Sequence, residues 1–298
     1  MESGIVMEER LEEFIRKLKN RHYNSKTIET YQNLLKHFMS FYEKHIIAGN
    51  TVRERDIERF IQYLKNKNLK STTIKAILRI SKKFIEFTGG RWEGDTKEIY
   101  RERDTVESAN PFSELQLKQI FNYLHDNNKI YYYLSLTLYG FGLRISEALS
   151  LKPQDFIETN GKIFIKVRPE ISKFNRDRLS PLILKDRCRE DLIDFIATRN
   201  NKKLKEYPLF TYYNDIQKRI ITIKPKTAEI YYHRLSKELD IHIHPHRFRD
   251  SYISYLISKG IKPLTVSKWA GHSNISTTLK FYAKLTTKDE LEELEKVW

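Results

Sequence analysis

The stretch HPHRFRDSYISYLISKG, residues 244–260, does most to decide what kind of domain this chain forms. Apolar side chains recur in it at helical spacing, which predicts a helix over 248–258. His246 and Arg249 stand three positions apart where that helix begins, so the two side chains share one face. Taken alone, such a basic pair also has an ordinary structural explanation, and its meaning depends on the rest of the chain.

The sequence around this segment is mainly helical in pattern, with one small sheet. Lys162–Val167 alternates as a strand does, and a polar turn separates it from a second short strand at Arg178–Pro181. Ser113 and Gln116 have the spacing of a capping box, which predicts that a helix begins there. Further helices are expected over 130–139, 186–198, 227–239 and 287–297. We therefore expect a mainly α domain with a small antiparallel β-sheet.

The first ninety residues have few helix breakers. Apolar residues at helical spacing predict four helices: over 8–18, from Asn24 and Ser25, from Thr51, and from Ser71 or Thr72 to Gly89. Four helices in this length make a small bundle. Residues 91–110 are polar, charged and without a clear period, so we expect a linker between a domain at 1–90 and a domain at 111–298.

The chain is strongly basic. Its 54 Lys and Arg residues against 39 Asp and Glu give a formal net charge of +15. Such an excess favours a polyanionic partner, nucleic acid before an anionic membrane. No stretch is apolar for the length of a membrane span, and the N-terminus lacks the pattern of a secretory signal. The single cysteine, Cys188, excludes an internal disulfide framework and fits a cytoplasmic protein.

Two of the expected helices carry polar faces suited to DNA. On the helix that begins near residue 71, hydroxyl and cationic side chains recur at helical spacing: Thr72, Thr73, Lys75, Arg79, Lys82 and Lys83. The helix over 227–239 is preceded by Lys226 and carries Arg234. Side chains of these types make phosphate and groove contacts in DNA-binding proteins. An ordinary solvated basic face has the same pattern, and the sequence leaves both interpretations open.

Basic and polar motifs follow a set order through the second half of the chain. GLRISEALSL at 142–151 comes first, Lys173 follows in the polar turn, HPHRFRDSYISYLISKG is next, and WAGHSNISTTLKFY at 269–282 comes last. This order of Arg, Lys, His-x-x-Arg, Gly-His and Tyr resembles that of the tyrosine recombinases and phage-type integrases of Xer- or Cre-like size. The helical N-terminal region is similar to the core-binding domain of the same family, so the resemblance covers nearly the whole chain.

The resemblance implies a site and a reaction. Arg144 and Arg249 would hold the non-bridging oxygens of the scissile phosphate, for which two guanidiniums are apt because each is a planar fork of donors that stays charged. Tyr282 would attack as nucleophile and become linked to the DNA 3′ phosphate. Lys173 would protonate the departing 5′ oxygen. The remaining members of the expected site are the histidines His246 and His272 and the orienting carboxylate Glu147.

The same resemblance implies that no metal, ATP or other cofactor is needed, because the phosphotyrosine link keeps the energy of the cut bond. The two domains would close around double-stranded DNA at a specific site, with four copies acting together. The helix over 287–297 would be exchanged between neighbours, or else cap its own domain. Two other functions stay compatible with the sequence: nicking and closing as in type IB topoisomerases, and DNA-binding regulation by a chain with an idle site.

Several positions depart from the family pattern or leave a choice open. Asp250 stands where many relatives carry His, which puts an acid beside Arg249, and Ala270 stands where Leu is common. A register shorter by one residue would put Phe281 in the place of the nucleophile, and phenylalanine cannot attack. Other basic side chains could replace Lys173 as the acid: Lys162, Lys166 and Arg176.

One group of histidines suggests a different chemistry. His242, His244 and His246 alternate along the chain, as metal ligands on one face of a strand do. No thiolate or carboxylate stands immediately beside them, and Pro245 distorts the alternation. We therefore expect no metal site there.

Overall fold

The computed structural model describes residues 2–45, 51–96, 100, 110–172, 176–201, 204–214 and 218–281. The chain divides into two compact units, Met1–Val106 and Glu107–Trp298, each of which has its own hydrophobic core. Among the described helices, none is long and apolar enough to cross a membrane.

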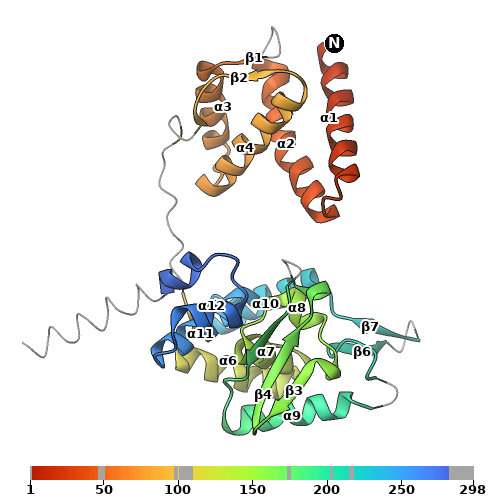
Figure 1. Ribbon diagram of the computed structural model, residues 1–298, viewed down its shortest axis with the longest axis vertical. Coiled ribbons are helices and arrows are strands. Elements are labelled where there is room, and N and C mark those ends of the chain that lie inside the picture. The colour runs from red at the N-terminus through yellow and green to blue at the C-terminus, as the bar shows by residue number, and fades with distance from the viewer. Residues whose placement is uncertain are drawn as a thin grey trace, which may run out of the picture. The chain divides into compact units, whose positions relative to one another are not determined.

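The N-terminal unit contains the four helices that the sequence predicts (Figure 1). They are α1 (Glu2–Asn20), α2 (Ser25–His45), α3 (Glu54–Asn66) and α4 (Ser71–Phe87). Phe14, Phe38, Phe60 and Phe84 interlock edge to face at their centre, with ring centroids 5.4–6.5 Å apart. Aromatic side chains at helical spacing on each inner face therefore hold the bundle together.

Two short strands correct the prediction for this unit. Thr51–Val52, expected to open the third helix, forms β1 and pairs in parallel with β2 (Arg91–Trp92), which the sequence assigned to the linker. Trp92 is 9% exposed and lies with its ring centroid 6.2 Å from that of Phe38. The indole is thus part of the core of the bundle, and a partner about forty positions away decides that β1 is a strand.

The C-terminal unit is built around one apolar helix. Its larger helices are α6 (Glu114–Asn127), α7 (Lys129–Phe141), α9 (Asp186–Arg199), α10 (Pro225–Leu239) and α11 (Pro245–Ser258), and its shorter ones are α8 (Ile145–Leu149), α12 (Pro263–Ala270), η1 (Pro153–Asp155) and η2 (Pro169–Ile171). The central helix α7 is buried over most of its length and packs against α6, α9 and α11. Ser113 and Gln116 form the predicted capping box at the start of α6.

A three-stranded antiparallel sheet lies against these helices (Figure 1). It consists of β3 (Phe156–Thr159), β4 (Lys162–Val167) and β5 (Arg178–Pro181), in that order. The bounds of β4 and β5 are those predicted. The sequence analysis missed β3, the hairpin of β6 (Thr211–Asn214) and β7 (Arg219–Thr222), and the helix α12. The predicted helix over 287–297 lies outside the described residues. The fold class, mainly α with a small antiparallel sheet, is confirmed.

Candidate active site

The turn between α7 and α8 is shaped around one arginine of α11. Gly142 ends α7 in the left-handed conformation, with a φ of 61°. A Cβ at this position would lie 2.2 Å from the ring of Tyr252, so only glycine fits. The carbonyl oxygen of Gly142 accepts a hydrogen bond from Nη1 of Arg249 at 2.6 Å. The close approach of α7 and α11 therefore places this guanidinium.

Arg249 is a buried cation with unused donors. Its side chain is 0% exposed, and within the described part of the chain its Nε and Nη2 atoms have no hydrogen-bond partner. Burial, followed by the positive charge of Arg144, lowers the pKa of Arg249 to about 9, so the group stays charged at neutral pH. A buried charge with unpaired donors is costly unless an anion binds to it.

Arg144 lies at the start of α8 and joins two distant segments. Its Nη1 atom is 2.9 Å from Oε1 of Glu147, and its Nη2 atom donates to the carbonyl oxygen of Gly271 at 2.9 Å. Gly271 ends α12 in the left-handed conformation with a φ of 69°. The side chain of Arg144 is 19% exposed, so it is less deeply buried than that of Arg249.

Glu147 is fully buried between two arginines, and sequence reasoning missed the second of them. Arg178, at the start of β5, donates through both terminal nitrogens to the carboxylate of Glu147, at 3.1 and 2.7 Å. Burial acts to raise the pKa of Glu147, but the hydrogen bonds and charges of Arg178 and then Arg144 outweigh it and hold the pKa below its usual value. The sequence signal for Arg178 is strand alternation, which puts it on the same face of the predicted strand as Ser180. In the structure that face is the buried one, since Ser180 is 0% exposed.

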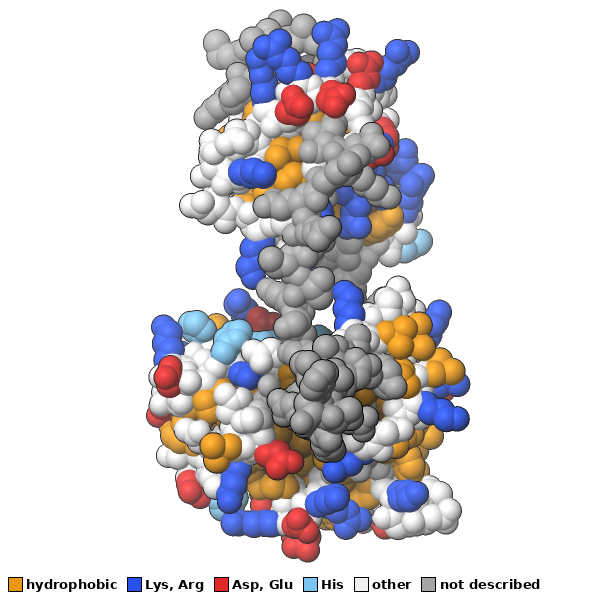
Figure 2. All heavy atoms as spheres, turned by 90° about the vertical axis from the view of Figure 1, so that its left-hand side faces the viewer, with side chains coloured by type: hydrophobic (Ala, Val, Ile, Leu, Met, Phe, Trp, Pro, Cys, Tyr) orange, Lys and Arg blue, Asp and Glu red, His pale blue; other side chains and the backbone are white. Residues whose placement is uncertain are grey.

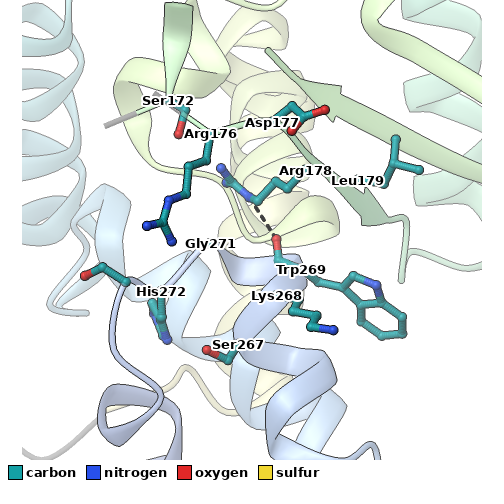
Figure 3. Close-up of a pocket in the computed structure, with 11 residues that line it drawn as sticks. Ser172, Arg176, Asp177, Arg178, Leu179, Ser267, Lys268, Trp269, Gly271 and His272 are labelled. Atoms are coloured by element: carbon teal, nitrogen blue, oxygen red, sulfur yellow. Dashed lines mark hydrogen bonds between the residues drawn. The ribbon is translucent and has the colours of Figure 1, made fainter. Parts of the chain in front are cut away.

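His272 follows Gly271 directly and lies next to the arginines. Its Nδ1 atom is 2.8 Å from the hydroxyl oxygen of Thr278. Burial, then the charges of Arg249 and Arg144, lower the pKa of His272 to about 3. The imidazole is therefore neutral at physiological pH and can contribute a hydrogen bond rather than a charge. It lines a pocket of about 480 Å³. Figure 3 shows Arg176 and Arg178 among the other side chains that line this pocket.

His246 and Asp250 lie on the same side of α11, one turn apart. The Nε2 atom of His246 is 3.6 Å from Oδ1 of Asp250, and the imidazole is 60% exposed. Burial raises the pKa of Asp250 to about 6, against the opposing effect of Arg249. Both residues line a second pocket of about 560 Å³ together with His242, His244 and His272. Figure 2 shows histidine side chains gathered on one face of the C-terminal unit, beside Lys or Arg.

The rival metal site has no supporting geometry. The rings of His242 and His244 lie 5.1 Å apart between centroids. Yet no three His, Cys, Asp or Glu side chains in the described ranges are arranged to hold a metal ion. The donor set present, neutral and cationic nitrogens around a buried arginine, fits an anion better than a cation.

Two members of the predicted site, Lys173 and Tyr282, lie outside the described residues. Phe281, the residue before Tyr282, is 7% exposed and packs with Tyr252 and Ile253, as expected of a core side chain. Of the alternatives to Lys173, Lys166 is exposed and alternates with the buried Ile165 and Val167, so it faces away from the core side of the sheet. Lys162 begins β4 at the end opposite to residues 168–177. Arg176 lines the pocket of Figure 3.

The residues predicted to contact DNA differ in how exposed their side chains are. On α4, Thr72 and Arg79 are exposed, while Thr73, Lys75 and Lys82 are half-buried. Lys83 donates to the hydroxyl oxygen of Tyr23 at 3.2 Å and lies over its ring, so it contributes to the packing of the bundle. On α10, Arg234 and Lys226 are exposed, and Lys226 lies 3.8 Å from Glu229.

The mainly α unit with its small sheet thus brings together Arg144, Arg178 and Arg249 beside the neutral His272, a donor set whose chemistry suits an anion better than a cation. The chain belongs to the phage integrase family, whose model matches residues 111–289. The model of the phage integrase N-terminal SAM-like domain matches residues 11–92. The resemblance to tyrosine recombinases and phage-type integrases is therefore confirmed.

Individual relatives agree with this assignment. A probable integrase/recombinase of Aquifex aeolicus is 33% identical over 181 residues, which are 55% of this chain and 56% of the relative. A tyrosine recombinase XerA of Pyrococcus horikoshii is 30% identical over 161 residues, 54% of this chain and 52% of the relative. The chain thus spans about half the length of these curated relatives.

A solved structure shows a similar fold over almost the full chain. The XerH site-specific recombinase bound to its palindromic difH substrate superposes with a TM-score of 0.71 at 19% identity. The match covers 97% of this chain and 84% of the XerH chain. At that identity the likeness concerns the fold of the two proteins.

Proposed function

We propose that this chain cuts and rejoins DNA strands at a specific site through a 3′-phosphotyrosine intermediate. The observation that supports this most directly is Arg249, a fully buried guanidinium whose Nε and Nη2 have no partner among the described residues. A phosphodiester offers two non-bridging oxygens that accept hydrogen bonds from such a fork. Binding it compensates a charge that is costly to leave unpaired.

The neighbours of Arg249 suit the transition state better than the ground state. As the phosphorus becomes five-coordinate, negative charge gathers on its equatorial oxygens, and preorganised donors stabilise it there. Arg144 adds a second fixed cation, and the neutral His272 adds a hydrogen bond. His246, at the exposed start of α11, assists proton transfer, and Glu147 orients Arg144.

In this mechanism Tyr282 supplies the nucleophile. Its phenol oxygen forms a bond to phosphorus while the bond from phosphorus to the 5′ oxygen breaks, and Lys173 gives its proton to that oxygen. A free phenol has a pKa of about 10, so the neighbouring cations must favour its ionised form. A 5′-hydroxyl from another strand reverses the step, and neither metal nor ATP takes part. The roles of Tyr282 and Lys173 rest on the family motif.

The partner in this proposal is double-stranded DNA. The Tn1549 transposon integrase, which has a similar fold, was solved in complex with a circular intermediate DNA, and a net charge of +15 favours a polyanion. Residues 1–90 would form the core-binding domain, 91–110 the linker and 111–298 the catalytic domain. Four copies would act together on DNA in the cytoplasm, exchanging or retaining the helix over 287–297.

A covalent-trapping experiment tests the proposal. A duplex library with a randomised centre, selected for binding to the chain, supplies the DNA site, and a nick placed near the cleavage position prevents religation. We expect a protein–DNA band that resists denaturation, that persists in chelator and that is lost in Tyr282→Phe. Tyr255→Phe, which removes a hydroxyl from α11, is the matched control and should keep the band.

Each other outcome favours a different function. Tight binding of the selected duplex without a covalent band would indicate a DNA-binding regulator. A covalent band with any duplex, together with relaxation of plasmids that lack the site, would indicate a nicking-closing enzyme. A band that chelator abolishes would revive the metal site at His242, His244 and His246.

A further inference from the structure

Arg178 on β5 contacts several residues of the candidate site, yet the proposed mechanism gives it no role. Its side chain is 8% exposed. Nη1 and Nη2 donate to the two carboxylate oxygens of Glu147, at 3.1 and 2.7 Å, and Nε donates to the carbonyl oxygen of Trp269 at 2.9 Å. Figure 3 shows the guanidinium reaching from the strand to this carbonyl. All three of its nitrogens are thus engaged.

These contacts tie together three elements that are distant in sequence. Glu147 lies on α8, Trp269 lies on α12, and Arg178 begins β5. A Cβ at Gly271 would lie 2.9 Å from the guanidinium of Arg178, so the glycine and the arginine also pack directly against each other. The position of the turn at the end of α12 therefore depends on this side chain.

The same partners hold the groups that the proposed reaction uses. Glu147 binds Nη1 of Arg144, and the carbonyl oxygen of Gly271 accepts from Nη2 of Arg144. His272 is the next residue after that glycine. Arg178 thus acts on the reaction indirectly. It holds Glu147 and Gly271, which both bind Arg144, and Gly271 also directly precedes His272.

Charge gives Arg178 a second effect. Two guanidiniums around one buried carboxylate leave one net positive charge in the group of Arg144, Glu147 and Arg178. Without Arg178, the carboxylate would neutralise Arg144 alone, and the group would carry no net charge. The field at the phosphate would then weaken by one charge in a site of low dielectric constant.

We propose that Arg178 is a positioning residue for DNA cleavage: it holds Glu147 and the turn at Gly271 so that Arg144 and His272 face the scissile phosphate. This inference rests on the proposed function. It concerns a side chain that the sequence motifs do not include, and it predicts a defect in the chemical step rather than in DNA binding.

The test measures cleavage and binding separately in Arg178→Gln. Single-turnover cleavage of the selected nicked duplex, with the chain in excess, should slow on the order of 10- to 100-fold, the range found when the hydrogen-bond partner that orients a metal ligand is removed, which is the same kind of indirect support. The dissociation constant for the same duplex should stay close to that of the unaltered chain. Thermal unfolding establishes that the variant is folded at the assay temperature.

Arg168→Gln is the matched control. Arg168 also forms a part-buried ion pair, with its Nε atom 2.8 Å from Oδ1 of Asp155, but it lies outside the site. Its loss should lower thermal stability without slowing the cleavage step. Arg178→Lys supplies a second variant, since its ammonium can reach Glu147 but cannot bind Trp269 at the same time, and we expect an intermediate rate.

Several results would overturn the inference alone. The first is a folded Arg178→Gln variant that cleaves as fast as the unaltered chain, or that slows no more than Arg168→Gln does. The second is a loss of DNA binding as large as the loss of cleavage. The third is failure of both Arg178 variants to fold. Absence of a covalent band with the unaltered chain would instead overturn the proposed function, and this inference with it.

Discussion

The carbonyl oxygen of Gly142 accepts a hydrogen bond from Nη1 of Arg249 at 2.6 Å, across 107 positions of sequence. Gly271 repeats the arrangement with Arg144, at 2.9 Å across 127 positions. In both cases a left-handed glycine ends a helix and offers its carbonyl oxygen to an arginine of the candidate site. The two guanidiniums are thus oriented by backbone, which cannot move as freely as a side chain.

Arg249→Lys should separate chemistry from folding. Lysine keeps a charge but loses the planar fork, so we expect DNA cleavage to slow on the order of 100- to 1000-fold with DNA binding retained. Single-turnover cleavage of the selected duplex measures the effect. A variant that cleaves normally would remove Arg249 from the proposed mechanism.

Arg247 provides the control on the same helix. Its Nε and Nη1 atoms donate to the carbonyl oxygens of Asn110 and His242, and its guanidinium lies 4.2 Å from the ring centroid of Phe112. Arg247→Lys should therefore lower the free energy of unfolding by about 1–3 kcal/mol while the folded molecules cleave normally. Chemical denaturation and the cleavage assay together check this.

Gly142→Ala should be among the most damaging single changes in the C-terminal unit. The new Cβ would lie 2.2 Å from the ring of Tyr252, and the left-handed backbone adds strain. We expect a loss of about 3 kcal/mol or more in the free energy of unfolding, measured in urea. Gly260→Ala is the control, because Gly260 also has a positive φ of 74° but has no atom near its Cβ position. Its loss should be about 1–2 kcal/mol, and equal losses for both variants would contradict the steric explanation.

Asp250→Asn should change how stability depends on pH. The pKa of Asp250 is raised to about 6 in the folded chain, above its unfolded value, so the folded state binds the proton more tightly. Its contribution to stability is full below about pH 4 and is lost as the pH rises through about 6. We expect the Asp250→Asn variant to match the unaltered chain near pH 4 and to exceed it by about 2–3 kcal/mol above pH 7, since each pKa unit is worth about 1.4 kcal/mol. Urea unfolding at pH 4 and pH 8 measures the difference between the two chains, and a difference that is the same at both pH values would contradict the raised pKa of Asp250.

Two basic residues of α4 should differ in their effect on DNA binding. Arg79 is exposed, whereas Lys83 donates to Tyr23 within the bundle. If α4 contacts phosphate, Arg79→Ala should reduce the slope of log affinity against log salt by about one. Lys83→Ala should leave that slope unchanged and lower the melting temperature instead. Equal slopes for Arg79→Ala and the unaltered chain would show that Arg79 makes no phosphate contact.

Local patterns predicted much of the fold. The capping box at Ser113, the bounds of β4 and β5 and the four N-terminal helices all follow from residue types a few positions apart. The errors lie where a distant partner decides. Thr51–Val52 has the local pattern of a helix start, but it forms a strand because it pairs with Arg91–Trp92. The elements β3 and α12 are too short for their own residue pattern to distinguish them from loops.

The candidate site divides in the same way. The motifs named Arg144, Glu147, Arg249 and His272, and the structure brings these four together. They did not name Arg178, because its partners Glu147 and Trp269 are 31 and 91 positions away. Nor did they separate Arg247 from Arg249, two arginines on one helix of which one is structural and the other has unused donors.

The sequence by itself determined the family, the order of the motifs and the helices that carry them, because spacing along one element sets which side chains share a face. Only the tertiary structure decided which basic groups are buried and which carbonyl oxygens orient them. It also decided that the pKa of His272 is lowered and that of Asp250 is raised. Those properties depend on desolvation and on charges from other elements, and neither is a property of any short stretch of chain.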